Sequence, residues 1–198
     1  VTHGTFSIDG EDFAVDNNIW LVGDDREVLI VDAAHEAGPI VEAVGGRRVV
    51  AIVCTHGHND HINAAVAVAD AVDAPILLHP DDTMLWEAVH PGRPVDGPLA
   101  HGQQLRVGAT VLEVRHTPGH SPGGCCLLDA DGGVLFSGDT LFQGGPGATG
   151  RSFSDRPTIL ASIRDQLLDL PPDTVVHTGH GDDTTSGAEA PGVLAELA

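Results

Sequence analysis

Four short polar clusters in this 198-residue chain each follow a strand-like run of apolar residues, and no other feature constrains the fold as strongly. CTHGHNDH comes after RVVAIV, TPGHSPGG after TVLEVRH, SGDT after GVLF, and TGHG after DTVVH. Loops held by a rigid scaffold are where functional groups commonly lie. We therefore expect these four clusters to converge at one edge of a layered sheet structure.

The rest of the chain alternates short β-rich runs with helical patterns. We expect strands at residues 18–22, 28–32, 48–54, 75–79, 110–116, 124–129, 133–139 and 173–179. We expect helices at residues 38–46, 62–72, 81–89, 157–170 and 187–198. This alternation predicts one α/β domain over residues 1–198, with sheets inside and helices outside.

Composition narrows the environment and the partners. The net charge is −20 and the chain contains no lysine, so its surface repels phosphate backbones, which argues against a nucleic-acid partner. No apolar run reaches membrane-spanning length, and the first residues lack a signal-peptide pattern, so we expect a cytoplasmic protein. Cys54, Cys125 and Cys126 lie in or beside apolar runs and are predicted to be buried thiols.

The cluster CTHGHNDH combines residue types that bind metal. His56 and His58 are separated by Gly57, which lets the backbone bend between them, while Asp60 and His61 follow at the predicted start of a helix. Imidazole nitrogens and carboxylate oxygens are the donors that a zinc-type ion accepts. Because the two pairs of side chains project in different directions, two ions fit this pattern better than one. A polar loop that caps the helix is the alternative.

Each later cluster adds one potential ligand. His120 lies on a stiff turn between two prolines, Asp139 lies at a strand end, and His180 lies between two glycines, which allow close approach. Each cluster alone is more typical of a turn. Together with residues 56–61 they supply five histidines and two aspartates on strand-end loops.

The order HxHxDH, TPGH, SGDT and TGHG resembles the metallo-β-lactamase superfamily, and within it the short glyoxalase II-like (hydroxyacylglutathione hydrolase-like) thioesterases. The resemblance runs from VLIVD to TGHG and implies an αβ/βα four-layer sandwich, two mixed β-sheets with helices outside. It assigns to the first metal His56, His58 and His120, and to the second Asp60, His61 and His180, with Asp139 as the bridge. Asp32 matches a position that supports the ligands from behind, with a simple strand-end cap as the alternative.

The resemblance also implies a function. Two divalent ions, zinc first and iron or manganese as alternatives, would share a hydroxide that attacks the carbonyl of a small-molecule thioester. Asp60 would orient that hydroxide in addition to binding metal. Arg151, after QGGPGATG, is the candidate for gripping a substrate carboxylate, with an ordinary surface position as the alternative.

Three departures separate this chain from relatives within the resemblance. It ends soon after TGHG, without the helical domain with which long glyoxalase II enzymes hold glutathione, so the thiol is left open. It has no tyrosine, which disfavours lactonases, and Asp139 at the bridging position disfavours lactamases that use a cysteine ligand. Two alternatives remain: a persulfide dioxygenase with one iron, and a non-catalytic metal-binding or ligand-binding protein of the same fold.

Overall fold

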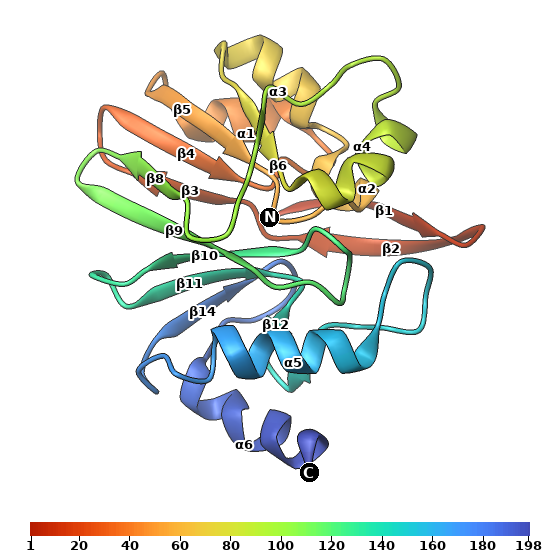
Figure 1. The fold of residues 1–198 in the computed structure, drawn as a ribbon. Helices are drawn as coiled ribbons and strands as arrows, with labels where there is room; N and C mark the ends of the chain where they lie inside the picture. The colour runs from red at the N-terminus through yellow and green to blue at the C-terminus, as the bar shows by residue number, and fades with distance from the viewer.

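The computed structural model describes residues 1–198 and packs two β-sheets face to face with helices on both outer sides (Figure 1). One sheet has five strands in the order β3-β4-β5-β6-β7, and the other has six in the order β15-β14-β11-β10-β9-β8. The predicted arrangement of sheets inside and helices outside is confirmed.

The five-stranded sheet is parallel except at one edge. Its strands are β3 (Trp20–Gly23), β4 (Glu27–Val31), β5 (Arg48–Val53), β6 (Ile76–Leu78) and β7 (Gly97–Pro98). Between them run α1 (Ala37–Val44), α2 (Asn59–Ile62), α3 (Ala65–Val72), the 3-10 helix η1 (Pro80–Asp82) and α4 (Thr83–Val89). Only β3 pairs antiparallel, with β4. The helical connections allow parallel pairing, because a tight hairpin can join only antiparallel strands.

The six-stranded sheet begins as a meander and ends with a crossover. Its strands are β8 (Gln104–Val107), β9 (Thr110–His116), β10 (Cys125–Asp129), β11 (Val134–Gly138), β14 (Val175–Thr178) and β15 (Thr184–Thr185). Helix α5 (Arg156–Gln166) joins β11 to its parallel neighbour β14, and α6 (Ser186–Leu197) follows β15. Both helices cover the outer face of this sheet (Figure 1).

Helix α5 is shorter than the sequence pattern predicts. The Asp155 side chain caps its start by accepting from the Thr158 amide at 2.9 Å, and Pro157 lies in the first turn. The prediction extended to residue 170, but the helix ends at Gln166 and a turn follows. This turn buries the Leu167 side chain completely, so tertiary packing outweighs local helix propensity there.

The core divides into three apolar layers, and strand β4 shows why. Val28 and Ile30 face the layer beneath α1 and α3, whereas Leu29 and Val31 face the layer between the sheets. A third layer lies between the six-stranded sheet and helices α5 and α6. Successive side chains of a strand point to opposite faces, so a strand covered on both sides is apolar throughout. The three cysteines are buried free thiols, as predicted.

A two-stranded hairpin that was not predicted lies at the N-terminus, β1 (Thr2–Ile8) with β2 (Glu11–Asn17). It projects beyond the two sheets in Figure 1. Its turn is Asp9-Gly10, with φ of 53° and 77°, which suits a tight hairpin because the chain needs positive φ there. A second small pair comprises β12 (Leu141–Phe142) and β13 (Gly145–Pro146). None of the helices combines the length and apolar composition needed to cross a bilayer.

Candidate metal centre

The structure brings together all seven predicted ligands. His56 and His58 lie in the loop after β5, Asp60 and His61 lie in α2, and His120 lies between β9 and β10. The remaining two, Asp139 and His180, follow β11 and β14. These two strands are parallel neighbours with Gly138 opposite Thr178, so their following residues emerge side by side. The predicted convergence of strand-end loops is therefore observed.

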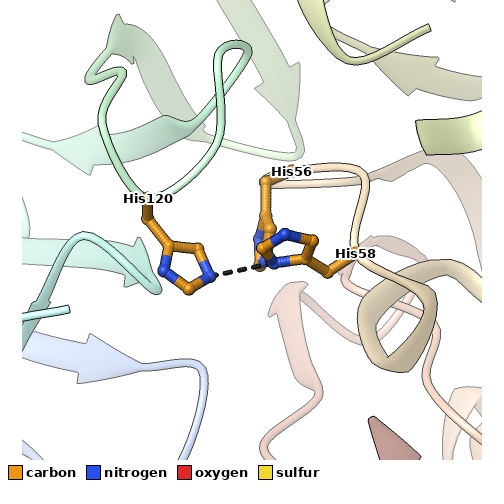
Figure 2. A group of neighbouring side chains, drawn as sticks. All are labelled: His56, His58 and His120. Atoms are coloured by element: carbon orange, nitrogen blue, oxygen red, sulfur yellow. Dashed lines mark hydrogen bonds between the residues drawn. The ribbon is translucent and has the colours of Figure 1, made fainter. Parts of the chain in front are cut away.

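Three imidazoles face one another in the first group (Figure 2). His58 Nδ1 lies 3.1 Å from His56 Nε2 and 2.9 Å from His120 Nε2. The outer nitrogen of His120 donates to the Ala148 carbonyl at 2.8 Å. The outer nitrogen of His56 lies 3.1 Å from Thr55 Oγ1, which accepts its proton because the Thr55 hydroxyl is itself donated to Asp32.

These outer bonds leave lone pairs on the inner nitrogens of His56 and His120. A single proton on His58 Nδ1 could satisfy only one of them, whereas a cation would satisfy all three nitrogens. Burial and the neighbouring His120 lower the pKa of His58 to about 3, and burial holds the pKa of His56 well below its usual range. Both rings are therefore neutral at neutral pH, as metal binding requires.

The second group contains Asp60, His61 and His180. The two imidazole Nε2 atoms lie 3.1 Å apart, and Asp60 Oδ2 lies 3.3 Å from His180 Nε2 and 3.5 Å from His61 Nε2. His61 Nδ1 donates to Asp32 Oδ2 at 2.9 Å, and His180 Nδ1 donates to the Asp16 carbonyl at 2.7 Å. The inner nitrogens again face one another.

Asp139 lies between the two groups. Its Oδ1 is 3.4 Å from His61 Nε2, and its Oδ2 is 3.4 Å from both His120 Nε2 and His180 Nε2. Asp139 Oδ1 and Asp60 Oδ1 are buried and have no hydrogen-bond partner. Buried charged oxygens without partners are costly, and a cation among these atoms would remove that cost.

The electrostatics of the second group favour positive charge. Although burial lowers the pKa of His180, hydrogen bonds to Asp139 and Asp60 raise it to about 10. Burial alone would raise the pKa of Asp139, but His61 and His180 hold it well below its usual range. In the absence of an ion a protonated imidazole therefore balances the carboxylates, and a divalent ion would replace that proton. This nitrogen and oxygen donor set fits zinc, iron or manganese.

A family comparison agrees with this donor set. The family model described as the metallo-beta-lactamase superfamily matches residues 13–180. The chain belongs to this superfamily. Membership supports a metal-dependent hydrolase, and the resemblance seen in the sequence is confirmed.

Members of the superfamily with known structures share the fold. The crystal structure of TTHA1623 in a di-iron-bound form superposes with a TM-score of 0.81 at 34% identity, covering 96% of this chain and 97% of that one. The crystal structure of the BLEG-1 B3 metallo-beta-lactamase gives a TM-score of 0.80 at 32% identity, with the same coverage. The predicted four-layer sandwich of this superfamily is thereby confirmed.

Curated relatives within the superfamily include hydrolases. The probable metallo-hydrolase YqgX of Bacillus subtilis is 35% identical, over 85% of this chain and 86% of its own length. The hydroxyacylglutathione hydrolase GloC of Haemophilus influenzae is 32% identical, over 89% of this chain and 91% of its own length.

Two residues outside the seven hold the ligand loops in place. Asp32 contacts His61, as described above, and also accepts from the Thr55 amide at 2.7 Å. Asp82 is completely buried and joins the His56–His58 loop to the loop that carries His120. Asp82 falls at the start of the helix predicted at residues 81–89, and no role in the centre was predicted for it. Its position just after strand β6 was the signal that could have marked it.

Arg151 lies against the N-terminal hairpin. Its guanidinium pairs with Glu11 and lies over the Phe13 ring, 5.4 Å from the ring centre. The next residue, Ser152, donates its amide to Asp9 at 3.1 Å. The loop after β13 is thus tied to the hairpin, and the predicted substrate role of Arg151 stays a prediction.

A third set of possible ligands, His79, Asp81 and His116, has a different geometry. The two imidazole rings are stacked, with centres 3.9 Å apart and planes 12° apart. His116 Nε2 also donates to the Pro122 carbonyl at 3.0 Å. Because imidazole binds an ion in the plane of its ring, one ion cannot fit two stacked rings, and this set is not arranged as a metal site.

Proposed function

We propose that this protein is a hydrolase with a binuclear metal centre, and that it cleaves the thioester of a small thiol. The observation that carries the proposal is the position of Asp139, whose two oxygens face the two donor groups at 3.4 Å. The relative named hydroxyacylglutathione hydrolase, similar over nearly its full length, supports the substrate class.

The residues present fit two ions, held by His56, His58 and His120 on one side and by Asp60, His61 and His180 on the other, with Asp139 between. Bound ions of this kind supply a nucleophile from water at neutral pH and polarise a carbonyl group. Zinc suits a thiolate leaving group. Iron is the alternative, because the similar TTHA1623 was solved in a di-iron-bound form.

Asp60 is placed to act on a proton. Burial raises the pKa of Asp60, but His61 and a hydrogen bond to His180 lower it by more. The pKa therefore lies below the usual value and the carboxylate is ionised. Its Oδ1 has no hydrogen-bond partner. This oxygen is therefore free to accept a hydrogen bond from an attacking water and to orient it.

A substrate would reach the centre where its side chains are exposed. The His180 side chain is 25% exposed and those of Asp139 and His120 are 11% exposed, while the other four ligands are buried. The Phe142 ring lies 6.3 Å from the His180 ring, centre to centre. An apolar acyl group or thiol stem entering beside His180 would meet this ring.

Two alternatives have different requirements. A persulfide dioxygenase with a single iron would not need the second donor group, which is fully assembled here. A non-catalytic binding protein would not need an unpartnered Asp60 oxygen beside the donor atoms. The similarity to BLEG-1, a metallo-beta-lactamase, adds β-lactams to the substrates that must be tried.

The test measures metal content together with hydrolysis of S-lactoylglutathione and related thioesters, a lactone and a β-lactam. Two ions per chain and thioester hydrolysis that Asp139→Ala abolishes would support the proposal. The matched control is Asp131→Ala, an exposed aspartate in the β10–β11 turn, which should behave as wild type. One iron per chain with oxygen consumption on a persulfide would overturn the proposal. Absence of metal-dependent turnover on every substrate would favour the binding protein.

A further inference from the structure

Asn17 is a buried polar residue at the end of a largely exposed strand. It is the last residue of β2 and is 0% exposed, whereas five of the other six residues of that strand are exposed. A buried amide must find hydrogen-bond partners, or its burial costs free energy. The partners of Asn17 therefore indicate why it is buried.

The Asn17 amide nitrogen lies against the inner donor atoms of the second group. Its Nδ2 is 3.1 Å from Asp60 Oδ2, 3.2 Å from His61 Nε2 and 3.5 Å from His180 Nε2. These separations match the 3.1–3.5 Å that separate the three donor atoms from one another. The amide thus covers the face formed by these three atoms and leaves no room there for water.

The direction of this amide is set by two further residues. Asn63 Oδ1 accepts from the His35 backbone amide at 2.5 Å, which turns Asn63 Nδ2 toward His35 Nδ1 at 3.2 Å. His35 Nδ1 must then be an acceptor, so the ring proton is on Nε2. That nitrogen lies 2.8 Å from Asn17 Oδ1 and donates to it. The Asn17 N–H groups must therefore face the metal ligands.

The fold holds His35 firmly in this position. Its backbone has φ of 62°, a conformation that histidine tolerates better than most residues. Its ring lies against Gly4 of strand β1, where a Cβ would overlap the imidazole. The N-terminal hairpin and the loop after β4 therefore combine to fix one amide beside the metal ligands.

We propose that Asn17 is a positioning residue of the second metal site. It donates an N–H to Asp60 and shields that side of the site from water, and His35 and Asn63 fix its direction. The inference rests on the two-ion part of the proposed function and is independent of the substrate. Groups that orient metal ligands typically raise metal affinity ~10–100-fold, so we expect an effect of that size on the second ion.

The experiment titrates metal-free protein with Zn²⁺ by calorimetry and records the visible spectrum of the Co²⁺-loaded form. Asn17→Leu keeps the branched shape and the number of heavy atoms of the side chain but cannot donate. We expect the first ion to bind as in wild type and the second to bind ~10–100-fold more weakly. The Co²⁺ spectrum should change as well, because water would enter the coordination sphere of the second ion.

A second variant removes the hydrogen bond from His35 that fixes the direction of the Asn17 amide. His35→Asn preserves tolerance of positive φ but is too short to reach Asn17, so we expect weaker binding of the second ion by a smaller factor. Unfolding measurements on the metal-free proteins would reveal whether Asn17→Leu folds. If it does not, His35→Asn provides the test.

The matched control is Asn59→Ala, another asparagine beside the ligands. Its side chain bonds only to the hairpin, at the Thr5 carbonyl (2.8 Å) and the Ser7 amide (2.9 Å). An equal loss of the second ion in this control would show that the hairpin alone matters and would overturn the proposal. Unchanged affinity in Asn17→Leu would do the same. A wild type that binds one ion would overturn both this proposal and the binuclear centre, whereas two ions without thioester hydrolysis would contradict only the proposed substrate.

Discussion

Asp82 Oδ2 accepts a hydrogen bond from the backbone amide of Gly57 at 2.7 Å, and this bond ties the His56–His58 loop to η1, directly before α4. The same carboxylate accepts from Ser121 Oγ at 2.7 Å and from the Gly123 amide at 2.6 Å. One buried side chain thus joins the two loops that supply the first three imidazoles, although none of its contacts involves a ligand side chain.

Asp82→Asn is expected to destabilise the protein by ~2–4 kcal/mol and to weaken binding of the first ion. Asparagine has only one acceptor oxygen. Its side-chain NH₂ group would therefore point at a backbone N–H that the Asp82 carboxylate accepts from in the wild type. Urea unfolding and metal titration would measure both effects. Asp81→Asn is the control, since its side chain is 58% exposed, and it should change little. Equal effects of the two substitutions would contradict this account.

Gly179→Ala is expected to displace Asp139 and to abolish tight binding of the second ion. A Cβ at this position would overlap Asp139 Oδ1 and lie 2.9 Å from His61 Cε1. Such overpacking costs ~1–3 kcal/mol, which thermal unfolding can detect. Gly38→Ala in α1 is the matched control, because nothing lies within 4 Å of its added Cβ. Retention of two tightly bound ions in Gly179→Ala would count against the position assigned to Asp139.

The metal-free protein is expected to be most stable near pH 6.5. Burial lowers the pKa of His58 to about 3, so its ring stays uncharged in the folded chain while it gains a proton in the unfolded chain below pH ~6.5. Stability is therefore lost as the pH falls from ~6.5 toward 3. His180 changes the stability in the opposite direction. Burial lowers its pKa, yet the carboxylates raise it to about 10, so its contribution is present below pH ~6.5 and is lost as the pH rises toward 10.

Urea unfolding of chelator-treated protein at pH 5, 6.5 and 9 would measure this profile. With ions bound, the imidazoles of the folded chain no longer gain protons. Stability should then rise with pH up to ~6.5, where the imidazoles of the unfolded chain lose their protons, and stay level above it. A metal-free protein that became steadily more stable from pH 6.5 to 9 would show that His180 is not held by the carboxylates as described.

Arg151→Ala is expected to raise KM ~10-fold for a thioester with a carboxylate and to leave kcat unchanged, if Arg151 binds that group. Glu11→Gln should lower KM, because Glu11 now occupies the guanidinium. A thioester with an uncharged acyl group is the control substrate. Equal KM values for wild type and both variants would show that Arg151 does not bind the substrate and only contacts the hairpin.

The sequence alone predicted much of this protein, because the evidence for it is local. The ligands lie in short motifs directly after strands, and the central strands of the two sheets have their own apolar patterns. The short edge strands β7 and β15 and the strand β8 have no such pattern and were not predicted. The hairpin β1–β2 was missed because its strands contain few apolar residues and most of their residues are exposed, so the Asp9-Gly10 turn is its main local signal. The predicted end of α5 was wrong because the burial of Leu167 determines where the helix ends.

Asp32 was indicated by the sequence, but only the tertiary structure showed that Asn17 and Asp82 also lie around the ligands. Asn17 is 43 residues from Asp60 in sequence, and Asp82 is 25 residues from Gly57 and 41 from Gly123. Neither residue lies in a recognisable motif. A ligand motif is short because one ion needs donors of particular chemistry at close spacing. The amides and carboxylates that contact the ligands need only lie near the site in space. Their positions in the sequence therefore depend on how the layers pack.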